Sequence, residues 1–246
     1  MTGPTSRTRD EELLLARISA AAGRARLGRR LATHTATAYR PLTRIGRHLA
    51  IRRLSAGARY GPSATTSPSP SPSPSARLDL YAQGMTVVVK GRVHVVRYDT
   101  TSVFQHRTGR RGSSFAGATV IHTLSDVAGK RLVLYGGPGG GGDPQGWERV
   151  AERAITCALL PGALAALHRG ERVWFGDVWL TTEHIGHQDA GTAWPWSQVQ
   201  RVGAAGGFLT ATVDGRRHRL GPPLSRIPNV FVLRALVEHC RDGDAP

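Results

Sequence analysis

A serine/proline tract at residues 62–75 constrains the fold of this chain more than any other feature. It reads PSATTSPSPSPSPS, with proline at every second position in its last part. Proline fixes φ and has no amide N–H, so a helix or a sheet strand cannot form here. This composition favours an extended, polyproline-like linker. We therefore expect a domain boundary, with an N-terminal region at 1–60, a linker at 61–76 and the main folded part after it.

Positive charge is distributed unevenly on the two sides of this tract. The chain has 33 lysines and arginines against 17 acidic residues, a formal net charge of +16. Residues 1–76 contain 13 arginines and 3 acidic residues, whereas residues 77–246 contain 20 basic and 14 acidic residues. A basic arm suits an anionic partner, either a nucleic acid or an acidic membrane surface. Codon bias is the alternative, because all basic residues except Lys90 and Lys130 are arginines.

The apolar runs are too short to predict a transmembrane segment. The longest, such as Leu13 to Ala16, fall far below the roughly 20 residues that a spanning helix needs. The N-terminus is polar and lacks the apolar core of a signal peptide. We therefore expect a cytoplasmic protein, at most peripheral to the inner face of the membrane. Cys157 and Cys240 are interpreted as two buried small hydrophobes rather than a disulfide, a redox pair or metal ligands.

The periodicity of apolar residues predicts two rounds of strands, each followed by a helix. A basic helix is expected at 10–32, before the serine/proline tract. After the tract, a helix is expected to begin at Asp143-Pro144 and to break at Pro161-Gly162, and a last helix to begin near Asn229, a candidate N-cap. Strands are expected at 85–89, 93–98, 102–106, 115–124, 130–135, 172–182, 192–196, 198–203, 207–213 and 216–220. This order predicts an α+β fold of antiparallel sheets covered by helices, with a duplicated unit.

Several segments together resemble a family of actinobacterial proteins that has no assigned activity. They are RLDLYAQGMTVVVKGRVHVVRYD (77–99), LLPGALAALHRGERVWFG (159–176), PWSQV (195–199) and IPNVFVLRALV (227–237). The fold of that family resembles tandem pleckstrin-homology-like domains, which implies one unit at 77–170 and a second at 171–243. The segment at 18–41 is similar to the family's N-terminal helix and lead-in strand. If residues 18–41 pack on the first unit, the serine/proline tract is an insertion.

Pleckstrin-homology-like folds are partly open β-barrels plugged by a C-terminal helix, and many bind acidic lipid headgroups through their first hairpin. This resemblance implies an anionic-ligand site at Lys90 and Arg92, which lie in the equivalent hairpin, with Arg110 and Arg111 in a nearby loop. Fold analogy alone does not assign function.

Glycine and histidine motifs do not predict a cofactor or a metal. Gly137, Gly139 and Gly142 match G-x-G-x-x-G, but Pro138 lies inside the motif and no second strand ending in an acid follows it. A flexible loop is the better interpretation. His184 and His187 are expected on opposite faces of a strand, too far apart to share a metal.

Paired acids and tryptophans are given structural interpretations. Glu148 and Glu152 lie one helical turn apart and are expected on a solvated helix face. Trp194 and Trp196 flank a proline and are expected to pack in a core.

These observations predict a non-enzymatic binding or scaffolding protein with no catalytic residue, no cofactor and no metal. Its expected partner is an anionic phospholipid or a protein at the cytoplasmic membrane face. The alternative is nucleic-acid binding through the basic arm at residues 1–60.

Overall fold

The computed structural model describes residues 8–38, 75–108, 119–136, 146–188, 191 and 193–242. Among them, a seven-stranded antiparallel sheet forms the first unit, with strand order β4-β3-β2-β1-β7-β6-β5. Its strands are β1 (Arg30–Ala38), β2 (Ser75–Tyr81), β3 (Gly84–Val89), β4 (Arg92–Arg97), β5 (Val103–Thr108), β6 (Thr119–Ser125) and β7 (Arg131–Gly136).

The central strand of this sheet comes from the basic N-terminal region. β1 pairs with β2 from Arg30, opposite Tyr81, to Thr37, opposite Ser75, and its last residues also pair with β7. The chain between the two paired strands, residues 39–74, contains the serine/proline tract. The tract is therefore an insertion between two neighbouring strands, as the arrangement with residues 18–41 on the first unit implies.

Helix α1 (Arg9–Arg24) is shorter than the helix expected at 10–32. Thr8 and Glu11 form a capping box at its start. It ends in a Schellman motif: Arg26 takes a left-handed φ of 53° and donates to the Gly23 carbonyl, and the amide of the fully buried Leu27 donates to the Ala22 carbonyl. The chain then turns into β1, whose three threonines favour a strand and which pairs with β2 and β7.

Helix α3 (Trp147–His168) continues through Pro161, so the break expected at Pro161-Gly162 is wrong. Proline removes one backbone hydrogen bond inside a helix. Here the two halves of the helix pack on two different cores, which holds the helix together across that defect. Gly146 precedes the helix with φ of 65° and no side-chain cap. Asp143 and Pro144, expected as its start, lie outside the described residues.

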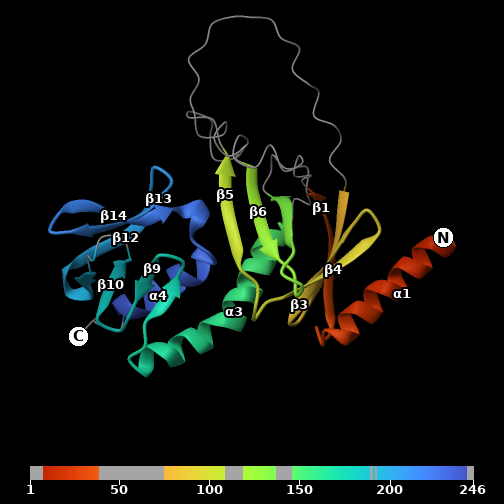
Figure 1. The fold of residues 1–246 in the computed structure, drawn as a ribbon, viewed down its shortest axis with the longest axis horizontal. Coiled ribbons are helices and arrows are strands. Elements are labelled where there is room, and N and C mark those ends of the chain that lie inside the picture. Colours follow the sequence, from red (N-terminus) through yellow and green to blue (C-terminus); the bar gives the residue numbers. More distant parts are fainter. Residues whose placement is uncertain are drawn as a thin grey trace, which may run out of the picture.

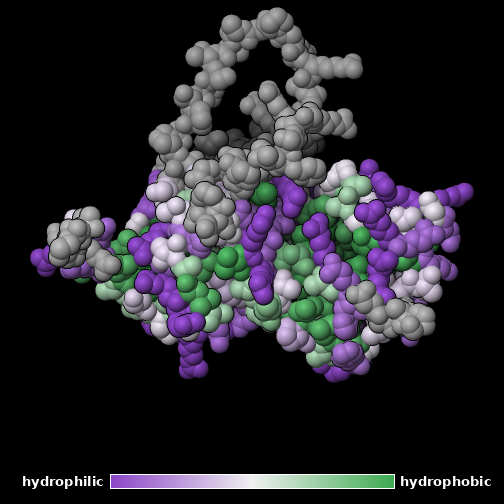
Figure 2. Space-filling model, turned by 180° about the vertical axis from the view of Figure 1, so that it is seen from behind, coloured by the Kyte–Doolittle hydropathy of each residue, from purple (hydrophilic) through white to green (hydrophobic). Residues whose placement is uncertain are grey.

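Because α3 is continuous, it is the single helix of the described residues that is long and apolar enough to cross a membrane. The short apolar runs of the sequence did not indicate this. Figure 2 shows apolar surface at the lower edge of the molecule, where the C-terminal half of α3 lies in Figure 1. One such helix is weak support for a span, because core helices have the same length and composition.

The second unit repeats the order of strands followed by a helix. β8 (Val173–Phe175), β9 (Val178–Leu180), β10 (His184–His187) and β11 (Ala193–Pro195) form one antiparallel sheet. After the 3₁₀ turn η3 (Trp196–Gln198), β12 (Val199–Ala205), β13 (Phe208–Val213) and β14 (Arg216–Pro223) form another. The 3₁₀ turn η4 (Leu224–Arg226) leads to α4 (Val230–Asp242).

Helix α3 extends from the seven-stranded sheet to the second unit (Figure 1) and packs on a hydrophobic core at each end. The first core contains Trp147, Ala151 and Ile155 from the N-terminal half of α3, packed on one face of the seven-stranded sheet. The second core contains Leu167 from its C-terminal half, packed with α4 and both small sheets. The half-buried Leu159 contacts both cores. The two units therefore share one continuous apolar interior.

Asn229 joins the two units by hydrogen bonds rather than capping α4 with its side chain. Its Oδ1 accepts from the Val103 amide at 2.8 Å, and its Nδ2 donates to the Thr101 carbonyl at 3.1 Å. Its own amide donates to the Val103 carbonyl at 2.8 Å. α4 does begin directly after Asn229, as expected, and the asparagine has a positive φ of 48° that this residue type tolerates. The start of α4 is thus fixed to the start of β5.

The observed architecture is α+β with antiparallel sheets, which confirms the fold class at this level. The described strands do not form a closed barrel.

Replacing Asn229 tests this connection. Asn229→Gly keeps a residue that accepts positive φ but removes both side-chain hydrogen bonds, so we expect the free energy of unfolding to fall by about 1–3 kcal/mol. Asn229→Ala should cost about 1 kcal/mol more, because alanine disfavours this φ. Urea unfolding followed by circular dichroism measures both, and equal stability of wild type and Asn229→Gly would contradict the role of the side chain.

Candidate functional site

A buried carboxylate lies on the face of the seven-stranded sheet opposite the first core. Along β2, Leu78 and Leu80 point into that core, so Arg77, Asp79 and Tyr81 point the other way. The Asp79 side chain is fully buried. A buried carboxylate requires partners, and the neighbouring strand β1 supplies some of them.

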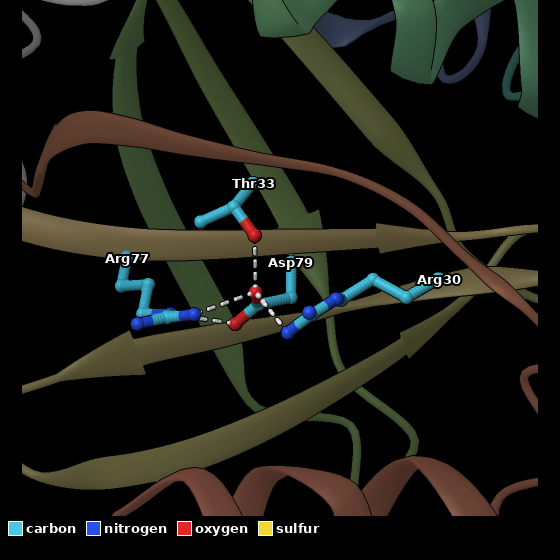
Figure 3. Close-up of polar contacts among 4 residues, drawn as sticks. All are labelled: Arg30, Thr33, Arg77 and Asp79. Atoms are coloured by element: carbon cyan, nitrogen blue, oxygen red, sulfur yellow. Dashed lines mark hydrogen bonds and ion pairs between the residues drawn. The ribbon is translucent and has the colours of Figure 1, made fainter. Parts of the chain in front are cut away.

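Three side chains surround this carboxylate (Figure 3). Arg77 donates from Nε to Oδ2 of Asp79 at 2.9 Å and from Nη2 to Oδ1 at 3.1 Å. Thr33 on β1 donates to Oδ1 at 2.6 Å. Arg30 Nη1 lies 3.7 Å from the same oxygen, and the Arg30 side chain is 53% exposed. Arg30 therefore pairs weakly with Asp79 and keeps donors for another acceptor.

The chemistry of Asp79 is that of a fixed anion. Burial alone would raise the pKa of its carboxyl, but the hydrogen bonds from Arg77 and Thr33 and the charges of Arg77 and Arg30 outweigh burial and hold the pKa below its usual value. A carboxylate with a lowered pKa is a poor proton acceptor. Asp79 is therefore suited to positioning the arginines.

A groove of about 330 Å³ lies beside this cluster, between α1 and the sheet. Its lining combines two apolar side chains, a hydroxyl, a carboxylate and two guanidinium groups, which belong to Leu14, Leu15, Ser19, Glu11, Arg30 and Arg77. Ser19 is the one hydroxyl of this lining, and no lining residue is a histidine or lysine that would activate it. The groove is chemically equipped to hold a small ligand with apolar and polar parts. Sequence reasoning missed it; the signal was an arginine and an aspartate alternating with leucines in one strand.

The candidate pair Lys90 and Arg92 lies at the turn between β3 and β4. Lys90 has a φ of 50° and Gly91 a φ of 72°, both in the left-handed region, which makes a tight two-residue hairpin. This is the hairpin that the sequence predicts between 85–89 and 93–98, but it is the third strand connection of the sheet rather than its first hairpin. Both side chains are exposed, and neither forms an ion pair with a described carboxylate.

The strand register places this turn at the same end of the sheet as the termini of most other strands. Val89 and Arg92 pair with each other, Val89 pairs with Ala76 at the start of β2, and β1 ends beside them. β7 ends at this edge and β6 begins at it, next to the end of β5. Figure 1 shows the upper ends of β5, β6 and β1 near one another. We call this edge the basic end, defined by Lys90, Arg92 and the last residues of β1, β5 and β7.

Two arginine-containing segments leave the sheet at the basic end. Residues 39–74 follow β1 and contain six arginines and no acidic residue. Residues 109–118 follow β5 and contain Arg110 and Arg111, again without an acidic residue. Arg110 and Arg111 lie outside the described residues, so their side chains are not placed. The topology nevertheless attaches their segment at the same end of the sheet as Lys90 and Arg92.

A second buried titratable group lies at the start of α3. His122 on β6 is 2% exposed and packs edge-on against Trp147, with ring centroids 5.1 Å apart. Its Nε2 has no hydrogen-bond partner. Burial lowers the pKa of His122 to about 4; the Glu148 carboxylate opposes this change and Arg107 adds to it. His122 is therefore neutral at pH 7.

The residues around His122 correct the interpretation of Glu148 and Glu152 as a solvated helix face. Glu152 is half-buried, accepts a hydrogen bond from Gln105 and has a pKa that burial raises. A Cβ at Gly136 would lie 3.1 Å from both the Glu148 carboxylate and His122 Nε2, so a larger residue there would require these two side chains to shift. The helical spacing did not reveal that this side of α3 lies against the sheet.

The remaining residues singled out in the sequence pack against other parts of the structure, are exposed, or lie outside the described residues. Trp196 is buried and donates to the Thr181 carbonyl at 3.0 Å, whereas Trp194 is half-buried and stacks near His218, with ring centroids 5.3 Å apart. Cys240 is buried as expected, but Cys157 is exposed, which corrects the prediction for that residue. Gly137, Gly139 and Gly142 lie outside the described residues.

Metal binding finds no support in the described ranges. They contain no group of three or more histidine, cysteine, aspartate or glutamate side chains that could hold an ion, and His184 and His187 lie on one short strand, β10.

No protein-family model matches the chain, and no curated protein is significantly similar to it in sequence. The chemistry of its own residues therefore carries the functional argument.

Asp79→Asn tests the buried ion pair. The amide cannot carry the charge that Arg77 and Arg30 require, so the free energy of unfolding at pH 7 should fall by about 2–4 kcal/mol. Asp99→Asn is the matched control, because Asp99 pairs with Arg97 in a partly exposed i, i+2 contact whose loss should change stability little. Urea unfolding compares the two, and equal effects would contradict a special role for Asp79.

The lowered pKa of His122 predicts a specific loss of stability in acid. As pH falls, the unfolded chain binds a proton at this histidine near pH 6.5, but the folded protein binds it only near pH 4. The stability that comes from keeping this histidine neutral is therefore complete above about pH 6.5 and is lost between about pH 6.5 and 4. The loss should be about 3 kcal/mol. Unfolding free energies measured across this range should depend less on pH in His122→Gln, and identical pH profiles would refute the assignment.

Proposed function

We propose that this protein is a non-enzymatic binding or scaffolding module that engages an anionic surface through the basic end of its first unit. Anionic phospholipid at the cytoplasmic face of a membrane is the proposed surface. The observation that carries the proposal is the gathering of cations at one end of the sheet: Lys90, Arg92 and the attachment points of the arginine-containing segments 39–74 and 109–118.

The expected strength of membrane binding by the basic end follows from electrostatics. Each basic residue held near an acidic membrane surface contributes about 1 kcal/mol, and the effect decays within a Debye length. Cations at one edge can approach a plane together, whereas the same cations scattered over the molecule cannot. Lys90 and Arg92 have no described carboxylate to compete with the surface.

The order of elements supports the proposed resemblance to tandem pleckstrin-homology-like units. In each unit the described residues form seven strands followed by one helix: β1–β7 by α3, and β8–β14 by α4. This support is architectural, and the ligand is inferred from the charges rather than from the fold.

The chemistry of the groove beside Asp79 favours binding over catalysis. Asp79, which lies beside the groove, is held ionised by Arg77, and the lining has no histidine or lysine to activate Ser19, its one hydroxyl. A scaffolding role also agrees with the shared interior of the two units, which keeps the basic end in a fixed relation to the second unit.

Co-sedimentation of the full chain with vesicles tests the proposal. The protein should pellet with phosphatidylserine-containing vesicles and not with phosphatidylcholine alone. The double variant Lys90→Gln/Arg92→Gln should weaken this binding by about 2 kcal/mol, roughly thirty-fold.

Lys130→Gln/Arg131→Gln is the matched control, because it removes one lysine and one arginine at the opposite end of the same sheet. It should bind nearly as well as the wild type. Equal losses in both variants, or no pelleting with anionic vesicles, would overturn the proposal. Release by nucleic acid with no effect of Lys90 and Arg92 would favour the alternative, a nucleic-acid-binding arm at residues 1–60.

A further inference from the structure

The three-stranded sheet β12–β14 has one face in the second core and one face outside it. Leu209, Ala211 and Val213 of β13 belong to the core, so Phe208, Thr210 and Thr212 lie on the other face. We call the face outside the core the arginine face, because the strand register brings arginines from both neighbouring strands to it.

Two cross-strand rows define the arginine face. In one row, Thr212 pairs with Arg201 of β12 and Arg217 of β14. In the next row, Thr210 pairs with Gly203 of β12 and Arg219 of β14. All three arginines are exposed. Their backbones are held at the fixed spacings of a sheet, about 4.8 Å between strands and about 6.8 Å between alternate residues of one strand.

Carboxylates are nearly missing from these strands. Residues 199–223 contain four arginines and a single acidic residue, Asp214 in the β13–β14 turn. Arg77, Arg97 and Arg169 each pair with an acid two residues along the chain. The arginines of the arginine face form no such pair with any described carboxylate. Their guanidinium groups are therefore free to bind an external anion.

The guanidinium groups are oriented over the sheet. Arg219 lies over the Phe208 ring, with Cζ 4.1 Å from the ring centroid. Arg201 leans toward the neighbouring row, since its Nε is 3.9 Å from the position of a Cβ on Gly203. Glycine leaves room there for a ligand to approach the backbone. A guanidinium stacked on an aromatic ring presents its other plane outward, where a nucleobase can stack.

We propose that the arginine face binds single-stranded nucleic acid, with phosphates on Arg201 and Arg217 and a base stacked on Arg219 above Phe208. Arginine favours this role because its planar donors match phosphate geometry. Stacking favours a nucleic acid over a lipid headgroup here, because a flat base can stack on the outer plane of the Arg219 guanidinium above the half-buried Phe208, whereas a phosphate headgroup cannot. This function is separate from the proposed surface binding by the basic end.

Fluorescence anisotropy of the full chain with a labelled oligothymidylate of about 12 nucleotides tests the proposal, since ordinary single-strand sites cover roughly 4–16 nucleotides. Arg201→Gln and Arg217→Gln should each weaken binding and reduce the slope of log affinity against log salt by about 0.7. Arg219→Lys keeps the charge but loses the stacking plane, so it should weaken binding about tenfold with the slope unchanged.

Arg216→Gln is the matched control, because Arg216 pairs with Val213 on the opposite side of β14 and loses the same charge. It should leave affinity and slope near the wild-type values. The proposal would be overturned if all three variants, Arg216→Gln, Arg201→Gln and Arg217→Gln, weakened binding equally, because the oligonucleotide would then respond to net charge and not to this face. It would also be overturned if only Lys90→Gln/Arg92→Gln reduced oligonucleotide binding, or if Arg219→Lys had no effect while phosphatidylserine vesicles displaced the oligonucleotide.

Discussion

The shared helix α3 is the constraint on which the rest of the structure depends. Trp147, Ala151 and Ile155 fill the first core, Leu167 fills the second, and Leu159 contacts both. From Ala154 to Leu167 the helix has no charged side chain, which gives it the composition of a membrane helix. Asn229 also links the two units through its hydrogen bonds to Val103 and Thr101, so movement of one unit relative to the other would disturb both cores.

Much of this architecture follows from local sequence signals. Alternating apolar residues predicted most strands to within a few residues, and Lys90-Gly91 marked a hairpin correctly. The expected strands did not include β1, β2 or β10, and the strand expected at 172–182 covers both β8 and β9. The wrong predictions have a common cause, because contacts between segments far apart in the sequence decided the observed structure. Residues 30–32 were expected to end the helix at 10–32, but they pair with β2 as the start of β1. Pro161 was expected to end a helix, but the helix continues because its two halves pack on two cores.

The sites were less predictable than the fold because side-chain partners come from strands far apart in the sequence. Exposed cations can be named from the sequence, but their gathering at one end depends on the order in which the strands pair. The ion pair of Asp79 needs Thr33 and Arg30 from beyond the serine/proline tract. The neutral state of His122 depends on Trp147 and on a glycine at position 136 that lets the helix approach. Of these partners, Gly136 alone lies in the same hairpin as the residue it affects, and the others come from more distant segments.

The insertion between β1 and β2 divides the chain into two pieces that meet in the middle of one sheet. The entropic cost of closing such a loop grows only with the logarithm of its length, about 0.6 kcal/mol for each doubling. The pairing of β1 with β2 and β7 is therefore nearly independent of what the intervening residues are or how many there are. The length and the net charge of residues 39–74 can therefore change without altering the sheet. A chain severed there would behave as a two-fragment protein, in which residues 8–38 supply a missing central strand to the remainder.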